Sequence, residues 1–360
     1  MTTTASAAPI NIGKLPWIDE HDRITSVVCD NKLYVFDRKH KVEGERVYSY
    51  AVFYTGLPFA IYDLSTKKLI HHEVHKDLNI AGDVAEMIFV INKDIYLMTF
   101  VSQDCIDLKD VYKFDKASNE FKHLFKMTGE TKYPGHYQNQ SCRLIKGGAD
   151  DKTNNVYFIS DAESSTDVVI ALNMLDAKVT KLTFEAENKD EQGMRLIMTN
   201  ACYHDNKIDV FGGVHGCGLM PVHNSVFRFD LKTMKHSVIP IIVADNFGLG
   251  MSSIAFMKYL PQKDAILIGR NYVTCGMAGG MQRKWDEKLW LLNNVSTSHL
   301  KWTRLNSRLS GNSELPDNRV IFANCDPDGE VVVYGKKQEG VFIQKVTFDT
   351  DEPDNFENYE

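Results

Sequence analysis

The sequence predicts an all-β protein built from six copies of one four-stranded antiparallel unit. Its apolar segments are short and rich in Val, Ile, Tyr and Phe, and turns of Asp, Asn, Gly and Lys separate them. This pattern is typical of strands joined by tight turns, and long amphipathic helical periodicity is missing. The third strands of successive copies recur at spacings of 52, 58, 57, 63 and 56 residues. A chain of 360 residues would otherwise suggest two or three ordinary domains.

Each predicted unit begins with a hairpin of two apolar strands. The turn between them contains Asp, Asn, Gly or Lys, which suit the positive φ angles of a tight hairpin. The six hairpins are VVCDNKLYVFD around Leu33, FVINKDIYLMTF around Ile95, KTNNVYFIS around Val156, CYHDNKIDVFGG around Ile208, LPQKDAILIG around Ile266 and CDPDGEVVVYG around Val331.

A third and a fourth strand complete each unit after a variable loop. The fourth strand follows a short turn, as around Phe121 and Trp302. The third strands end at Asp63, Asp115, Asn173, Asp230, Asn293 and Asp349.

The sixth unit has no clear fourth strand of its own. Residues Ile10 to Ile12 precede Leu15-Pro16 as Trp302 to Leu305 precede Leu315-Pro316. We therefore expect residues near 9–14 to supply the missing outer strand. The expected organisation is a disordered N-terminus over 1–8, a single domain over 9–349 and an acidic disordered tail over 350–360.

The repeated unit resembles the kelch repeat. The best copy is DNKIDVFGG (205–213) followed by VFRFD (226–230), and the fifth copy contributes Trp302 and Leu305. The paired glycines occur only as Gly212-Gly213, with Gly269-Arg270 and Gly335-Lys336 as half matches and Asp37-Arg38 as a replacement. The resemblance implies a six-bladed β-propeller of four-stranded blades, like the galactose-oxidase central domain, with its ring closed by the N-terminal strand. It also implies a scaffold or adaptor that binds a peptide or protein segment, of the ubiquitin-ligase adaptor or cytoskeletal type.

The charge is concentrated at the C-terminal end. The formal net charge is -7, and the segment DTDEPDNFENYE from Asp349 onward holds six acidic residues and no basic one, which leaves about -1 for the rest. The only basic run, RKHK at 38–41, is diluted by Glu43 and Glu45, so no nucleic-acid partner is expected.

The lack of a recognisable secretory signal and the scattered cysteines predict a cytoplasmic or nuclear protein. The start MTTTASAAPI has neither the basic nor the apolar region of a secretory signal, and no stretch approaches the apolar length of a membrane span. Seven cysteines are scattered without C-x-x-C spacing, as expected for reduced thiols. Cys29, Cys202 and Cys325 end first strands and are expected in the core.

The predicted binding site lies on the long loops. In a four-stranded blade the loops between strands 2 and 3 and the links from strand 4 to the next strand 1 share one face, and here they are long and rich in aromatic residues and arginine, the types enriched in protein interfaces. The predicted protein-binding residues are Arg38, Arg46, Tyr48, Tyr50, Tyr54, Tyr133, His136, Tyr137, His215, His223, Arg270, Tyr272, Arg283 and Trp285.

No catalytic residue, cofactor or metal is predicted. The segment HHEVH (71–75) lacks H-E-x-x-H spacing and reads as a fourth strand. The glycines of GGVHGCG and GMAGGM do not lie between a strand and a helix, as a phosphate-binding loop would require. The alternative is a small-molecule or metal-dependent enzyme at the mouth of the propeller pore, where His215, Cys217 and His223 could form a soft N/S metal site.

Overall fold

A computed structural model shows an all-β chain. The described residues are 9–14, 24–37, 40–41, 53–54, 57–75, 84–101, 105–134, 143–161, 168–187, 200–211, 214–215, 220–221, 225–242, 251–277, 280–284, 288–308, 320–336 and 339–349. The one helical element among them is a single 3-10 turn, Pro261–Lys263, so no described helix is long enough to cross a bilayer.

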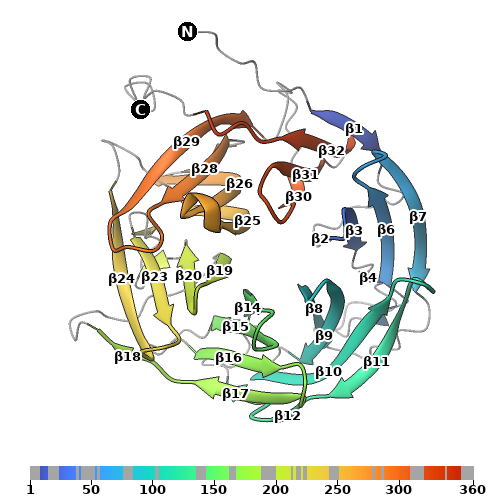
Figure 1. Ribbon diagram of the computed structural model, residues 1–360, viewed down its shortest axis with the longest axis horizontal. Coiled ribbons are helices and arrows are strands. Elements are labelled where there is room, and N and C mark those ends of the chain that lie inside the picture. Colours follow the sequence, from blue (N-terminus) through green and yellow to red (C-terminus); the bar gives the residue numbers. More distant parts are fainter. Residues whose placement is uncertain are drawn as a thin grey trace. The chain divides into compact units, whose positions relative to one another are not determined.

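The chain divides into two compact units, an N-terminal unit of Ile12–Thr183 and a C-terminal unit of Met1–Asn11 with Phe184–Glu360. The N-terminal unit contains three main antiparallel sheets (Figure 1, blue to green). The first sheet has β2 (Ile24–Cys29), β3 (Lys32–Asp37), β6 (Leu57–Asp63) and β7 (Lys68–His75). The second has β8 (Val84–Ile91), β9 (Asp94–Val101), β10 (Cys105–Asp115) and β11 (Glu120–Lys126), with β13 (Lys132–Pro134) beside β10. The third has β14 (Arg143–Asp150), β15 (Asn155–Asp161), β16 (Val168–Asn173) and β17 (Lys178–Leu182), with β12 (Thr128–Gly129) beside β17.

The C-terminal unit repeats this arrangement. One four-strand run is β19 (Asn200–His204), β20 (Lys207–Phe211), β23 (Ser225–Asp230) and β24 (Lys235–Ile242), with β18 (Glu185–Ala186) beside β24. The next is β25 (Met251–Leu260), β26 (Ala265–Met277), β28 (Lys288–Asn293) and β29 (Leu300–Arg308), with β27 (Gly280–Lys284) beside β26. The last is β30 (Val320–Cys325), β31 (Val331–Lys336), β32 (Gly340–Lys345) and β1 (Ile10–Gly13), of which Ile10 and Asn11 fall within this unit. Two further two-stranded pairs are β4 (His40–Lys41) with β5 (Phe53–Tyr54), and β21 (Val214–His215) with β22 (Met220–Pro221).

Within each unit, the first strands of neighbouring four-strand runs lie beside one another. In the N-terminal unit β8 contacts both β2 and β14, and in the C-terminal unit β25 contacts both β19 and β30. In a β-propeller, successive four-stranded blades meet along their first strands. The runs of each unit show the same arrangement. Each unit is therefore propeller-like.

The tight turns between first and second strands follow the predicted chemistry. Both turn residues have positive φ at Asp30-Asn31 (49° and 57°), at Asn92-Lys93 (50° and 63°) and at Asp205-Asn206 (43° and 62°). Two consecutive positive φ angles define the hairpin turn that matches the twist of the strands, and Asn and Asp tolerate them best. The predicted hairpins at these positions are confirmed.

Short parallel pairings connect consecutive sheets. The segment that follows a fourth strand pairs with the first residues of the next fourth strand: β12 with Lys178-Val179 of β17, β18 with Lys235-His236 of β24, and the end of β24 with Leu300-Lys301 of β29. Each pairing covers part of an exposed sheet edge, which would otherwise invite unwanted strand addition.

The expected six separate blades are not found as six separate sheets. The pairing of Ile241 with Leu300 and of Ile242 with Lys301 joins two runs into one ten-stranded sheet, so the described strands form five sheets of four or more strands. The structure therefore shows an all-β, propeller-like fold.

The N-terminal strand pairs as expected. β1 is the outermost strand of the last sheet and lies beside β32. The Asn11 side chain donates a hydrogen bond of 2.9 Å to the backbone carbonyl of Glu339, and Ile12 is buried.

Aromatic side chains fill the space between neighbouring sheets. In the N-terminal unit Phe114 of the second sheet packs edge-on against Tyr34, Phe36 and Phe59 of the first sheet at centroid distances of 5.6, 6.3 and 5.7 Å. Such edge-to-face contacts add to the area that the rings bury.

Candidate functional site

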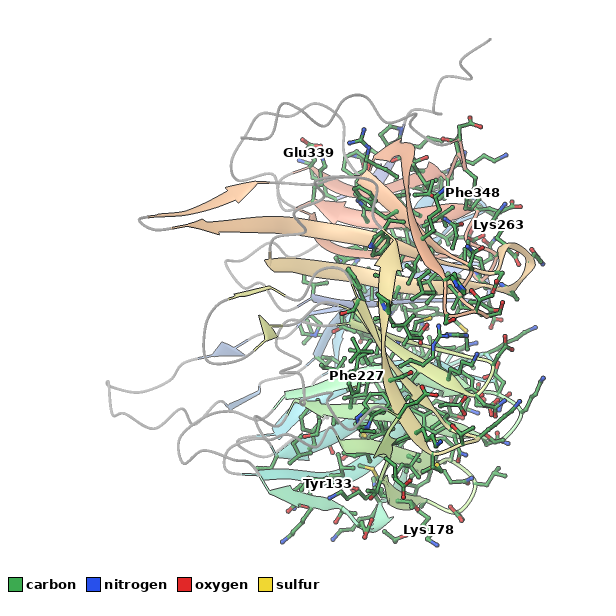
Figure 2. The ribbon with its side chains drawn as sticks, turned by 90° about the vertical axis from the view of Figure 1, so that its left-hand side faces the viewer. Tyr133, Lys178, Phe227, Lys263, Glu339 and Phe348 are labelled. Atoms are coloured by element: carbon green, nitrogen blue, oxygen red, sulfur yellow. The ribbon has the colours of Figure 1, made fainter. Side chains whose placement is uncertain are left out.

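The C-terminal unit carries a strand extension beyond its sheet. β26 pairs with β28 only from Ala265 to Gly269, and from Val273 to Met277 it pairs with β27 instead. β25 follows β26 as far as Thr274, so the extension has three strands at its base. Figure 2 shows the β26–β27 hairpin as long light-orange strands that project on the side away from Lys263 and Phe348.

Gly269 marks the place where β26 changes partner. It lies opposite Phe256 in the ladder, and a Cβ on Gly269 would come within 2.2 Å of the Phe256 ring. The register between β25 and β26 shifts twice just beyond this point, between Ser253 and Ile254 and between Ile254 and Phe256. Bulges of this kind bend and twist a strand pair, and here they occur where the extension leaves the sheet.

The extension is basic. Residues 270–284 contain Arg270, Arg283 and Lys284 and no Asp or Glu. Arg270 lies opposite Ile254 in the ladder, Tyr272 opposite Ser253, and Arg283 opposite Thr274. Three residues that the sequence assigns to protein binding, Arg270, Tyr272 and Arg283, therefore belong to one structural element.

A buried lysine lies at the corresponding position of the next sheet. Lys336 follows Gly335 as Arg270 follows Gly269, and Gly335 lies opposite Phe322, whose ring would be 2.1 Å from a Cβ. The Lys336 ammonium is 3.5 Å from a Glu339 carboxylate oxygen and 5.8 Å from the centre of the Phe342 ring. Glu339 lies toward the hairpin side in Figure 2.

The other predicted binding residues are placed less completely. Tyr54 is in β5 opposite His40, and His215 is in β21 opposite Met220. Outside the described residues lie Arg38, Arg46, Tyr48, Tyr50, His136, Tyr137, Cys217, His223 and Trp285.

Tyr133 lies in the core of the N-terminal unit rather than on its surface. It is 4% exposed, and its hydroxyl donates a hydrogen bond to the backbone carbonyl of Glu130. Burial raises the pKa of the Tyr133 hydroxyl. The tyrosine is on β13, which pairs with β10, so its side chain packs inside its own unit.

Sequence reasoning missed a buried ionic cluster of His204, Asp209 and Arg228. The Arg228 guanidinium binds Asp209 through two nitrogens, at 2.6 and 2.7 Å, and His204 Nε2 is 2.9 Å from the same carboxylate. Arg228 also donates to the carbonyls of Val295 at 2.8 Å and Thr297 at 3.2 Å, in the turn between β28 and β29. The available signal was a charged residue at an interior position of each of two strands, Asp209 in KIDVF and Arg228 in SVFRFD.

The carboxylate of this cluster is held ionised. Complete burial by itself would raise the pKa of Asp209, but hydrogen bonds from Arg228 and His204 lower it below its ordinary value. Because Arg228 links β23 to the turn of the neighbouring run, the cluster joins two four-strand runs of the C-terminal unit.

Another polar cluster joins two sheets of the N-terminal unit. The Lys116 ammonium donates 2.6 Å to the Lys93 carbonyl, contacts the Asp30 carboxylate and is 3.4 Å from Cys29 Sγ. Burial raises the pKa of the Cys29 thiol, although Lys116 partly opposes this. Cys29, Cys202 and Cys325 are buried and not in disulfides, as predicted.

The histidines of β7 form no metal-binding motif with their neighbours among the described residues. The HHEVH segment lies in strand β7, as predicted, and His71 Nε2 is 3.4 Å from a Glu73 carboxylate oxygen. Within the described part of the chain, no group of three or more His, Cys, Asp or Glu side chains is arranged to hold a metal ion.

The comparisons identify the fold and no family. No protein-family model and no curated protein matches the chain. Among solved structures, an α-L-arabinanase from Penicillium chrysogenum complexed with arabinobiose is 11% identical with a TM-score of 0.54, over 96% of this chain and 99% of that one. A chain of a mitotic checkpoint complex is 10% identical with a TM-score of 0.41, over 97% and 96%. The Dos1 propeller is 11% identical with a TM-score of 0.40, over 90% and 75%. At these identities the arabinanase similarity shows a shared fold and nothing about activity.

Proposed function

We propose that this protein is a propeller-type interaction module that binds a peptide or protein segment on the side of its long loops. The observation that carries the proposal is the β25–β26–β27 extension, which continues past the partner change at Gly269 and brings Arg270, Tyr272 and Arg283 onto one element. Extended strands that leave a packed sheet add little to its core, whereas arginine and tyrosine are frequent interface anchors. A scaffold or adaptor in the cytoplasm or nucleus is the role that fits best.

The finer architecture also belongs to this proposal. Six four-strand runs, three in each unit, would form six kelch-like blades of one ring that β1 closes. The glycines that match half of the kelch glycine pair support the resemblance. Gly269 and Gly335 hold equivalent positions, and at each one an aromatic ring lies where a Cβ would otherwise be.

The test removes the extension and leaves the sheets in place. Residues 273–284 are replaced by a four-residue Gly-Ser linker, and the partners of wild type and variant are compared by crosslinking, affinity purification and mass spectrometry. The control is Leu175→Asp, a charge added at a side chain that is 78% exposed on a turn of the other unit. We expect specific partners to be lost from the linker variant and retained by the control. If the linker variant folds normally and keeps every partner, the proposal is wrong.

The enzyme alternative has a separate test. A metal-dependent site at His215, Cys217 and His223 would hold a transition metal in stoichiometric amount. Elemental analysis of the purified protein, repeated on His215→Ala, would reveal a metal that the substitution removes. That outcome would favour the enzyme over the interaction module.

A further inference from the structure

We propose that β27 accepts an acidic, extended segment of a partner protein as an added strand. This inference rests on the function proposed above and assigns the chemistry of the partner. It concerns the five residues Gly280–Lys284, with the sequence GMQRK.

β27 has an outer edge along which a further strand could pair. Among the described strands β27 pairs only with β26, through Val273–Met277. In an antiparallel pair, alternate residues direct their N–H and C=O groups away from the partner strand. The outer edge of β27 therefore offers backbone donors and acceptors, and an extended peptide can pair with them.

The position of β27 differs from that of the fourth strands of the sheets. The fourth strands β17, β24 and β29 each receive a short parallel strand from elsewhere in the described chain. β27 receives none from it and lies on the projecting hairpin shown in Figure 2. Beyond Gly269 the hairpin no longer pairs with β28, so among the described strands only β26 lies along β27.

The positive charge of the extension favours an acidic partner segment. The extension carries three basic residues and no acidic one over 270–284, while the chain as a whole has a net charge of -7. Arg283 and Lys284 lie on β27 itself, opposite Thr274 and Val273. Basic residues on an edge strand discourage pairing between two such edges, and they attract an acidic segment by the same electrostatics.

The probe is a capped, fluorescein-labelled decapeptide of alternating Glu and Thr, titrated with the full chain at low salt and followed by fluorescence anisotropy. A Lys-Thr decapeptide tests the sign of the charge. A Glu-Thr decapeptide N-methylated at every residue keeps the five carboxylates but cannot form a strand ladder, because it has no backbone N–H group to donate. Two further Glu-Thr peptides carry N-methyl groups either on every Glu or on every Thr.

The protein variants separate local from bulk charge. R283E/K284E reverses two charges on β27, and K232E/K235E makes the same charge change at two exposed lysines, one in the β23–β24 turn and one at the start of β24. Thermal unfolding of both variants confirms that they are folded.

We expect the Glu-Thr peptide to bind wild type and K232E/K235E alike, and R283E/K284E about tenfold more weakly or worse. One N-methylated peptide should retain binding and the other lose it, since only one set of N–H groups faces the protein. Equal binding of the fully N-methylated peptide overturns strand addition, and equal weakening by K232E/K235E overturns the local site. If the probe binds only after residues 350–360 are removed, the occupant is the acidic tail of the chain itself, and the partner assignment is wrong.

The result is distinguishable from failure of the proposed function. If the linker variant loses its partners but no acidic peptide binds wild type, the module stands and only the acidic strand is excluded. If the linker variant keeps its partners, the proposed function fails whatever the peptide does.

Discussion

Gly269 and Gly335 each lie beneath an aromatic ring, Gly269 where β26 last pairs with β28 and Gly335 near the end of β31. The two rings, Phe256 and Phe322, lie directly opposite these glycines in their ladders, at distances that exclude a Cβ. At the corresponding position of the first sheet, Asp37 lies opposite Ile24, which has no ring. The glycines are therefore present where the first strand carries a Phe, and this accounts for the partial match to the kelch pattern at these three positions.

We expect Gly335→Ala to destabilise the protein by about 1–3 kcal/mol, because the added methyl group forces the Phe322 ring to move. Urea denaturation of wild type and variant measures the change. The double variant Phe322→Leu with Gly335→Ala is the control and should recover part of the loss. Strictly additive effects of the two substitutions would show that the ring contact is not responsible.

The buried Asp209 predicts a specific dependence of stability on pH. Its folded-state pKa lies below the ordinary value of 3.8, so the cluster stabilises the fold above that pH and loses its contribution as the pH falls through the folded pKa. Asp209→Asn leaves Arg228 buried without a carboxylate and should lower the free energy of unfolding at neutral pH by roughly 3–5 kcal/mol. The difference between wild type and variant should shrink below about pH 4.

Chemical denaturation between pH 2.5 and 7 measures this difference. Asp205→Asn is the matched control, because the Asp205 carboxylate accepts a 3.0 Å hydrogen bond from Tyr259 at an exposed position. A difference between wild type and Asp209→Asn that stays constant with pH would contradict the assignment of the charge to Asp209.

At the scale of elements, the hairpins were predictable and the parallel links were not. Turn residues such as Asp205-Asn206 announce a hairpin by their own conformational preferences. The links formed by β12 and β18 consist of two residues each. Two residues carry no periodicity, and which edge they join depends on how the sheets pack. The β26–β27 extension was missed for a related reason, since its sequence reads as a loop until a partner strand is known.

Removal of β1 tests the most distant pairing that the sequence did predict. A variant lacking residues 1–14 exposes the edge of β32 and loses the buried Ile12 side chain. Burial of one such side chain contributes about 1.5–3 kcal/mol, and the lost ladder hydrogen bonds add to this. We expect a clearly lower melting temperature in differential scanning fluorimetry. Removal of residues 1–8 alone is the control and should leave the melting temperature nearly unchanged.

At the scale of the whole molecule, the two compact units and the proposed single ring make different predictions. One closed ring of six blades should unfold in a single cooperative transition, with equal calorimetric and van't Hoff enthalpies. Independent units should give two steps. Hydrogen exchange at intermediate urea concentrations locates the steps, through amides of Phe158 in the N-terminal unit and of Phe227 in the C-terminal unit. Loss of protection in one before the other would contradict the single ring.

The sequence by itself determined the all-β class, the hairpins, the order of strands within each four-strand run and the N-terminal outer strand. These features follow from the conformational preferences of individual residues and from a repeat that is visible in the sequence. The tertiary structure decided which glycines lie beneath rings, how Asp209 and Arg228 neutralise each other, which fourth strands receive a parallel link and where β26 leaves its sheet. Each of these depends on contacts between residues of different strands, and contacts of that kind are set by packing rather than by the pattern of any single segment.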